Sequence, residues 1–307
     1  MNMYVIAGNI AILLTFGLIG WCLKTFQVLS SENLKLLSVL EVWVFLPAKM
    51  LTGFSRNFTL KYISQKYGLI LLSCILLAVT VVLCAWLVPK FVQDKYRQKI
   101  IRYSLTIPNY SYVGYALVES VYGEMMMLNM MIFALPMSVY VYTEGYRMLT
   151  NGNRISFRKM INPVFVAILF GCLIGLTGIH IPDVLQSVIR KAGDCMAPVS
   201  MLMAGITIAD YDWKALLKDY RLYQLTFLRL ILIPVILCML LSRFLPREMV
   251  VIAVILYAMP CGFNTIIFPK MIGEDCKTGA GLALISSVLC VATIPFCMQC
   301  VEWFTAG

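Results

Sequence analysis

One stretch of the sequence decides the fold: YAMPCGFNTIIFPKMIGED, from Tyr257 to Asp275. It lies in an apolar region, yet its first eight residues include a proline, a glycine and an asparagine. Proline lacks a backbone N–H and its ring blocks the carbonyl one turn earlier, so it kinks or breaks a helix. In a membrane, the backbone groups that a break frees are costly unless protein, water or a ligand bonds them. The stretch therefore predicts either a simple kink or a binding site made from exposed backbone groups.

The composition is typical of an integral membrane protein. Of the 307 residues, 61% are hydrophobic and 13% are charged, whereas a soluble domain is about half apolar and about a quarter charged. The N-terminal MNMYVIAGNIAILLTFGLIGW has neither a basic n-region nor a small-residue cleavage site, so we interpret it as a first span and not as a signal peptide. The formal net charge of +10 is attributed to cytoplasmic Lys and Arg, and we expect no nucleic-acid partner.

Apolar stretches long enough to cross a bilayer, about 20 residues each, predict an all-α membrane protein with ten transmembrane helices. The connections between them are short, and none leaves room for a soluble domain. The predicted spans are residues 3–23, 35–54, 68–88, 101–123, 126–147, 161–179, 185–209, 221–242, 249–271 and 277–301.

The distribution of basic residues predicts that both termini lie outside. With this orientation, 16 of the 25 Lys and Arg residues fall in or beside the inner connections, as the positive-inside rule requires. The connection between the second and third spans, which carries Arg56, Lys61 and Lys66, argues against it. We expect a multi-pass protein of the cell (inner) membrane, with the lipid bilayer as its surroundings.

The two halves of the chain share features at nearly the same offset. Pro47 and Pro198 lie 151 positions apart, and the Gly-Glu pairs that begin at Gly123 and Gly273 lie 150 positions apart. A duplicated unit of five spans must insert in opposite orientations, which gives the inverted repeat of many secondary transporters. We therefore predict a first repeat at residues 1–147, a cytoplasmic connecting loop at 148–160 and a second repeat at 161–307.

The fourth span carries a second interruption at the corresponding place. The stretch TIPNYSYVGYALVES, from Thr106 to Ser120, contains a proline, an asparagine and a glycine. Paired interruptions in two halves point to a transporter site, because half-helix N-termini present free N–H groups and a partial positive charge to an anion. We expect helix breaks at Pro108 and Pro260. The predicted substrate-binding residues are Asn109, Tyr110, Ser111, Gly114, Pro260, Gly262, Asn264 and Thr265.

Four ionisable residues fall inside predicted spans, where such groups are functional candidates by default. They are Glu41, Glu119, Asp194 and Arg229. Asp194 follows Arg190 by four residues, so we interpret the two as an ion pair on one helix face. The alternative is that Asp194 is a protonatable coupling site, a role that Glu119 shares as a candidate. We expect Arg229 to pair with an acid or to extend its guanidinium towards the membrane interface.

The remaining chemistry-bearing residues indicate no further site. The 11 cysteines are scattered through apolar runs, where a free cysteine is a small packing residue. We predict no disulfide framework, no metal site and no cofactor. The one histidine, His180, lies in the loop TGIHIPD and is assigned no catalytic role. The sequence contains no HExxH or GxSxG motif and no GxxxxGK[ST] nucleotide-binding loop.

Several stretches resemble the auxin efflux carrier family, whose bacterial members include malonate and malate carriers and whose plant members include the PIN carriers. The family is related to the bile acid/sodium symporter-like superfamily. The similarity covers nearly the whole chain. The stretches that carry it are GLIGWCLKTFQVLSSENLKLLSVLEVWVFLPA, NPVFVAILFGCLIG, APVSMLMAGITIA, LRLILIP, AMPCGFNTIIFPKMIGED and ISSVLCVATIP.

The resemblance implies a scaffold domain made from helices 1, 2, 6 and 7 and a transport domain made from helices 3–5 and 8–10. It implies a substrate site where broken helices 4 and 9 cross, with Pro47 and Pro198 lining the scaffold. It also suggests a homodimer through the scaffold. The fourth span departs from the family pattern, because Tyr115 and Ala116 stand after Gly114 where the family has a Gly-x-Pro. The departure suggests a pocket of altered size or a softer break.

The predicted function is secondary active transport of a small organic anion, a carboxylate in many members of the family, by alternating access. A channel or a membrane-embedded sensor is the alternative, and an intramembrane enzyme is a more distant one. The identity of the substrate, the direction of transport, the oligomeric state and the coupling ion, proton or sodium, stay open.

Overall fold

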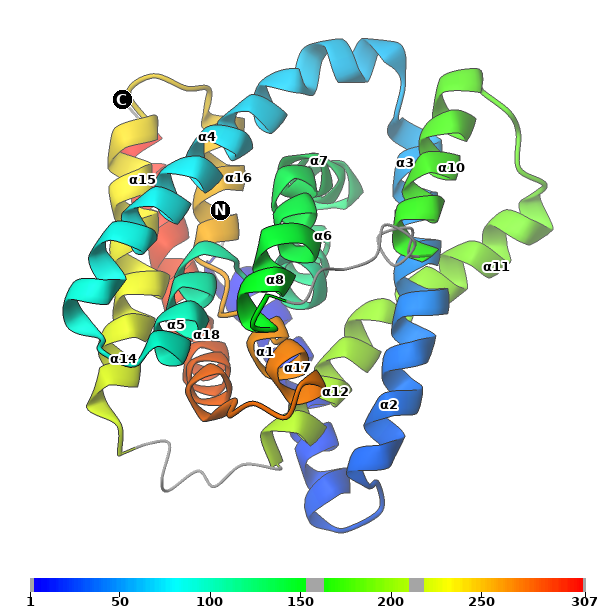
Figure 1. Cartoon of the computed structure of the whole chain (residues 1–307). Helices are drawn as coiled ribbons and strands as arrows, with labels where there is room; N and C mark the ends of the chain where they lie inside the picture. The colour runs from blue at the N-terminus through cyan, green and yellow to red at the C-terminus, as the bar shows by residue number, and fades with distance from the viewer. Residues whose placement is uncertain (1–2, 153–162, 210–217, 306–307) are drawn as a thin grey trace.

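The computed structural model describes residues 3–152, 163–209 and 218–305 and is shown in Figure 1. Within these ranges the regular structure is helical, and the only extended pairing is one isolated bridge. The protein is therefore all-helical in the part of the chain that the structure describes, as the sequence predicts.

The first half contains α-helices that are joined in places by π-helical turns. The π-helical turns are labelled η. η1 and η3 each join two α-helices into one continuous helix, and η2 begins the helix that α6 continues. The elements are α1 (Met3–Thr25), α2 (Ser31–Leu40), η1 (Glu41–Phe45), α3 (Leu46–Asn57), α4 (Leu60–Phe91), α5 (Lys95–Thr106), η2 (Tyr110–Gly114), α6 (Tyr115–Tyr122), α7 (Glu124–Tyr140), η3 (Val141–Gly145) and α8 (Tyr146–Leu149).

The second half repeats this pattern of long helices and interrupted ones. Its elements are α10 (Pro163–Thr177), α11 (Asp183–Asp194), α12 (Met196–Ala209), α14 (Tyr220–Phe227), η4 (Leu228–Leu232), α15 (Ile233–Leu241), α16 (Arg247–Tyr257), α17 (Asn264–Met271) and α18 (Lys277–Thr305).

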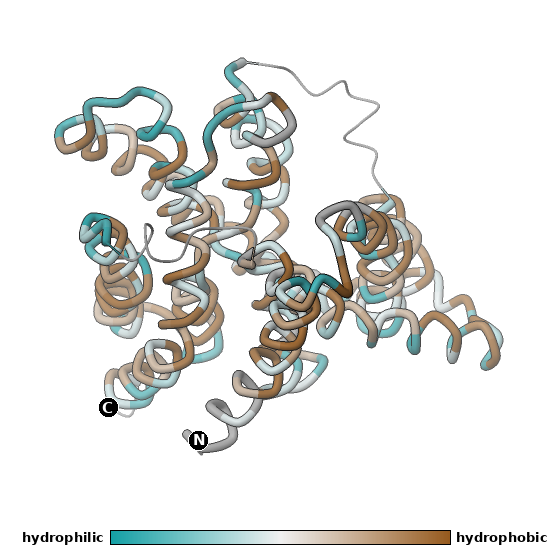
Figure 2. Tube along the Cα trace, turned by 90° about the horizontal axis from the view of Figure 1, so that it is seen from below, coloured by the Kyte–Doolittle hydropathy of each residue, from teal (hydrophilic) through white to brown (hydrophobic). Residues whose placement is uncertain are grey.

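Five helices among the described residues are long and apolar enough to cross a membrane, which makes this a multi-pass membrane protein. Figure 2 shows hydrophobic residues along most of the helical tube. Two shorter apolar helices, at Ala11–Thr25 and Pro163–Thr177, accompany the five. The five helices are Leu36–Asn57, Ser64–Phe91, Glu124–Leu149, Tyr220–Leu241 and Lys277–Thr305.

One group of helices packs through glycine. α1 runs along α12, and α10 and α11 pack on α3; Figure 1 shows α2, α3, α10 and α11 standing to one side. The backbones approach closely, because a Cβ on Gly205 of α12 would lie 1.8 Å from the carbonyl oxygen of Gly17 in α1. A Cβ on Gly175 of α10 would likewise lie 2.7 Å from the carbonyl oxygen of Phe54 in α3. Small residues at such contacts are typical of helices that associate within a membrane.

A second group surrounds α16. This helix packs against α7, α15 and α18, and α4 packs along α5 and α7. Every residue of α16 from Val250 to Tyr257 is buried. A helix that is apolar all round belongs in the interior of a helix bundle, so α16 forms the centre of this group.

The two halves share an unusual backbone conformation at the Gly-Glu pairs that the sequence singled out. Gly123 follows α6 with a φ of 84°, and Gly273 follows α17 with a φ of 73°. Residues with a side chain rarely adopt positive φ, whereas glycine does so freely. The interrupted segment of each half is therefore followed closely by a glycine that needs this freedom.

Candidate substrate site at two interrupted helices

The two interruptions lie side by side and bond to each other. α5 ends at Thr106 and η2 begins at Tyr110, while α16 ends at Tyr257 and α17 begins at Asn264. The N–H of Asn109 donates to the carbonyl oxygen of Pro260 over 2.8 Å. Pro108 and Cys261 form an isolated antiparallel bridge. Backbone groups freed by one break are thus partners for groups freed by the other, which offsets the cost of opening both helices in an apolar interior. We call the segment pair 107–109 and 258–263 the junction.

Side chains satisfy other backbone groups of the junction. Ser286, buried in α18, accepts a hydrogen bond from the N–H of Cys261 over 2.9 Å. The hydroxyl of Thr265 donates to the carbonyl oxygen of Gly262, also over 2.9 Å. The break in the second half is therefore held open by specific bonds. Thr265 takes part in this bonding as a predicted residue of the site, whereas no sequence pattern indicated Ser286.

The two asparagines of the predicted site have different surroundings. The Asn264 amide donates to the hydroxyl of Tyr103 over 2.9 Å, so it already has a partner within the protein. Asn109 is only 2% exposed, and its side-chain nitrogen has no hydrogen-bond partner among the described residues. Buried polar groups are normally bonded. The Asn109 amide is therefore a free donor at the junction.

The aromatic residue after Asn109 packs against α7 and α6. The hydroxyl of Tyr110 lies 2.8 Å from that of Ser138 in α7. Its ring meets that of Tyr115 edge-to-face, with centroids 5.8 Å apart. Ser111 is half-buried, and Gly114 is buried so close to α7 that a Cβ would lie 2.7 Å from the Met130 side chain. These residues position the start of α6 against α7.

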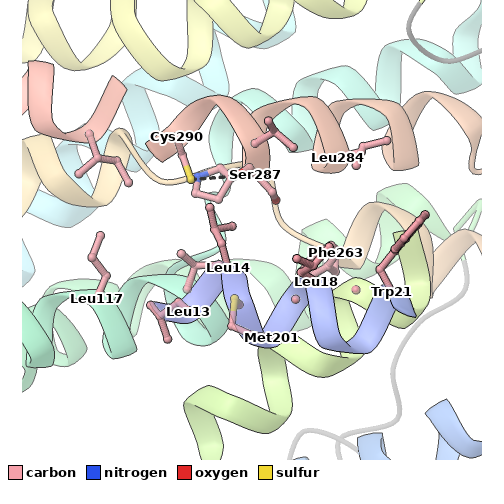
Figure 3. Close-up of a pocket in the computed structure, with 16 residues that line it drawn as sticks. Leu13, Leu14, Leu18, Trp21, Leu117, Met201, Phe263, Leu284, Ser287 and Cys290 are labelled. Atoms are coloured by element: carbon pink, nitrogen blue, oxygen red, sulfur yellow. Dashed lines mark hydrogen bonds between the residues drawn. The ribbon is translucent and has the colours of Figure 1, made fainter. Parts of the chain in front are cut away.

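A cavity of about 500 Å³ lies beside the junction (Figure 3). Its walls come from α1, α12, η2, α6 and α18, and Figure 3 shows side chains of α1 and α18 facing each other across it. Pro260 and Phe263 of the junction line it. Among the predicted substrate-binding residues, Pro260 is the only one in its lining, and the polar residues of the junction are not part of it. Apolar side chains that line the cavity include Leu13, Leu14, Leu18, Leu117, Met201 and Leu284.

One buried lysine joins both predicted coupling residues. The Lys49 ammonium, on α3, lies 2.6 Å from a carboxylate oxygen of Glu119 on α6 and 3.6 Å from one of Asp194 on α11. The interpretation that Asp194 pairs with Arg190 is wrong, because the end of α11 packs on α3 and brings Asp194 to Lys49 instead. Sequence reasoning missed Lys49, although a lysine two residues after Pro47 in an apolar span was a usable signal.

Glu41 is also fully buried and lies among the first group of helices. It belongs to η1, and one of its carboxyl oxygens accepts a hydrogen bond from Ser200 of α12 over 2.6 Å. Its other oxygen has no partner among the described residues. This bond links η1 to α12, and it lies on different elements from the junction.

The prolines predicted to line the scaffold both lie in helical backbone. Pro47 lies two residues after the π-helical turn η1, within the continuous helix Leu36–Asn57, and Pro198 is the third residue of α12. A proline inside a helix leaves the carbonyl one turn earlier without its usual bond, and π-helical geometry occurs mostly as single turns inside α-helices. Neither residue is in the lining of the cavity.

Arg229 fits neither of the two predicted arrangements. It is 0% exposed, so its guanidinium does not extend to an interface, and it has no acidic partner among the described residues. One guanidinium nitrogen donates to the carbonyl oxygen of Leu105 over 2.7 Å. Its Nε and Nη2 atoms have no described partner. The sequence pointed to Arg229 as an unusual group but not to its surroundings.

These observations define a multi-pass membrane protein in which two interrupted helices meet beside an apolar cavity. A family model described as membrane transport protein matches residues 5–157 and 151–298. The chain belongs to this family, which is the auxin efflux carrier family, as the resemblance in the sequence predicts. A search of curated proteins found no match.

Proposed function

We propose that the protein is a secondary active transporter that binds an organic anion at the junction and carries it across the membrane by alternating access. The observation that carries this proposal is the paired break itself, with the Asn109 N–H bonded to the Pro260 carbonyl and the Asn109 amide free. Membership of a membrane transport family supports transport in general. The family match does not name the cargo, so the anion is argued from the chemistry of the junction.

The junction favours an anion through its helix ends. In our proposal the chain forms ten spans, and the fourth and ninth, each broken, cross at the junction. The second half-helices start at Tyr110 and Asn264, next to the paired segments. Helix N-termini present unbonded N–H groups and about half a positive charge each, which is a common anion-binding arrangement. The free amide of Asn109 adds a donor to a carboxylate there.

The cavity indicates that the anion has an apolar part. Its lining is almost wholly apolar, and it adjoins the junction through Pro260 and Phe263. Ligand sites of this size commonly combine apolar walls with a few polar groups that fix orientation. We therefore propose a carboxylate held at the junction and an apolar body in the cavity. A very small dicarboxylate leaves most of this cavity unfilled.

The packing supports a scaffold of α1–α3 and α10–α12 and a transport domain of α4–α8 and α14–α18. Contacts are extensive within each set and sparser between the sets. The cavity lies between them, since α1 and α12 line one part and α6 and α18 line the other. A substrate site between a fixed and a moving unit is what alternating access requires. In this proposal both termini face outward from the cell (inner) membrane, and the scaffold is the surface through which a homodimer forms.

The Lys49 ion-pair cluster is the proposed link between movement and coupling. It joins α3 and α11 of the scaffold to α6 of the transport domain. A rigid movement of α6 relative to α3 breaks the bond between Lys49 and Glu119, and a coupling ion that binds the released carboxylate compensates for the loss. Either a proton or a sodium ion can bind a carboxylate that has lost its lysine partner.

Uptake by purified protein in proteoliposomes tests the function. The panel contains monocarboxylates with aromatic or branched apolar bodies, their uncharged amides, and short dicarboxylates, each under separate proton and sodium gradients. We expect saturable, concentrative uptake of at least one apolar monocarboxylate and none of its amide. Uptake that never exceeds equilibrium under any gradient indicates a channel. An absence of saturable uptake for every anion contradicts the proposal.

A further inference from the structure

Arg229 is the largest fully buried side chain in the part of the chain that the structure describes. No described carboxylate forms an ion pair with it, and two of its three guanidinium nitrogens have no hydrogen-bond partner. An uncompensated charge in the interior of a membrane protein is costly. A group that persists in this state is a candidate for a role in function.

The location of Arg229 relates it to both breaks. Its hydrogen-bond acceptor, the carbonyl of Leu105, belongs to the last turn of α5. Its guanidinium carbon lies 5.4 Å from the ring centroid of Tyr257, the last residue of α16. The cation therefore bonds directly to the C-terminal end of α5 and contacts the side chain of the last residue of α16, so it lies near the ends of both half-helices that lead into the junction. Its contacts with the carbonyl and the ring are favourable, but neither neutralises its charge.

The four helix ends at the junction otherwise oppose one another. Two of them are N-termini, which attract an anion, and two are C-termini, which repel it with about half a negative charge each. An anion at similar distances from all four gains little net attraction. A full positive charge placed at the two C-termini cancels both of them, and the attraction of the N-termini then prevails.

We propose that Arg229 is a positioning residue for anion binding: by neutralising the C-terminal ends of α5 and α16, it gives the junction a positive potential without touching the substrate. The inference rests on the proposed function, because it takes the junction as the binding site. It goes further in assigning the charge preference of that site to one buried residue, which lies on η4, between α14 and α15, and outside both broken helices.

The test measures electrostatic potential at the junction without any substrate. Ser111, half-buried in η2, is replaced by cysteine in a background in which the exposed Cys74 and Cys195 are serine. The probes are sulfonatoethyl methanethiosulfonate, an anion, and trimethylammonioethyl methanethiosulfonate, a cation. The readout is the ratio of their reaction rates at position 111, followed by the mass of the peptide that contains it.

The expected result is a shift of this ratio when the buried charge is lost. One charge acts in opposite directions on the two probes, so Arg229→Gln is expected to lower the anion-to-cation rate ratio by about tenfold or more. Arg229→Lys keeps the charge and is expected to stay within about threefold of the parent. Arg221→Gln is the matched control, since Arg221 lies on α14 of the same continuous helix and is exposed, and it is expected to leave the ratio unchanged.

A second variant keeps the test decisive if Arg229→Gln does not fold. Thr226 is buried three residues before Arg229, and its hydroxyl has no described partner. A carboxylate from Thr226→Asp can pair with Arg229 on the same helix face and cancel its charge while the arginine stays in place. We expect the same fall in the anion-to-cation rate ratio.

An unchanged ratio in a folded Arg229→Gln or Thr226→Asp protein overturns the inference. A failure of transport in proteoliposomes contradicts the proposed function instead, and leaves this ratio measurable in the same protein.

Discussion

Asn109, in the junction, and Asn264, directly after it, show how one residue type takes two different roles. Asn264 bonds to the hydroxyl of Tyr103, whereas the amide of Asn109 is buried without a partner. A hydrogen bond within the protein stabilises the fold, and a free donor is available to a ligand. The sequence singled out both residues but gave no means of distinguishing them, because Tyr103 lies on the other interrupted segment.

The bond between Asn264 and Tyr103 is therefore expected to matter for stability. Asn264→Ala and Tyr103→Phe should each lower the free energy of unfolding by about 0.5–1.5 kcal/mol. The double variant should lose less than the sum, because each single change already breaks the same bond. Thermal unfolding in detergent gives the three values. Fully additive losses show that the two side chains act independently and contradict the assignment.

The Lys49 cluster predicts unequal effects at its two acids. Glu119 lies 2.6 Å from the lysine and Asp194 lies 3.6 Å from it, and the Asp194 side chain is 60% exposed. A charge-assisted bond is worth about 1.5–3 kcal/mol, so Glu119→Gln should reduce concentrative uptake by about tenfold or more. Asp194→Asn should reduce it less. Exchange of substrate across the membrane, measured beside uptake, should persist in both variants. A larger loss of concentrative uptake in Asp194→Asn makes Asp194 the principal coupling residue instead.

At the scale of elements, the close packing of α1 on α12 depends on glycine. A Cβ at position 205 would lie 1.8 Å from the Gly17 carbonyl, so Gly205→Ala forces the two backbones apart. The expected loss of stability is about 1–3 kcal/mol, the usual cost of overpacking. Gly8→Ala on α1 is the control, because a Cβ there meets nothing within 4 Å. Thermal unfolding of the two variants measures the difference, and equal unfolding temperatures contradict this account of the packing.

The positions of the helix breaks could be predicted from the sequence, whereas the hydrogen-bond partners of the residues at those breaks could not. Proline and glycine change backbone geometry locally, so Pro108, Pro260 and Gly262 marked where helical bonding stops. The bond between Asn109 and Pro260, and the acceptor Ser286, depend on how distant segments pack. The same limit explains the wrong pairing of Asp194. Helical spacing suggests partners within one helix, and Lys49 lies 145 positions away in the sequence.

At the scale of the whole molecule, composition and hydropathy were enough to predict an all-helical membrane protein, and the resemblance of several stretches predicted its transport family. They were not enough to predict the cavity. Its lining comes from helices at both ends of the sequence, among them α1 and α18, and each lining residue taken alone is an ordinary apolar residue of a span. The sequence therefore predicted polar groups at the candidate site but not its apolar wall.

The orientation in the membrane stays a prediction, and it has a direct test. Single cysteines at the two ends of the chain should react with an impermeant thiol reagent in intact cells, in a background without the exposed Cys74 and Cys195. Phe26→Cys, in the exposed connection between α1 and α2, should react only after the membrane is opened, because the positive-inside rule places this connection in the cytoplasm. The reverse labelling pattern contradicts the orientation.

The central claim is that an anion binds at the junction, and one measurement tests it most directly. A transported anion from the uptake panel is titrated into purified parent protein, Asn109→Ala and Asn264→Ala, and heat release gives the dissociation constants. Loss of a hydrogen bond to a charged ligand costs about 1.5–3 kcal/mol, so Asn109→Ala should bind about 10- to 100-fold more weakly. Asn264→Ala, whose amide is already bonded to Tyr103, should bind within about threefold of the parent at a temperature where it is folded. If a folded Asn109→Ala protein binds the anion as tightly as the parent, the junction is not the binding site and the two breaks are only kinks.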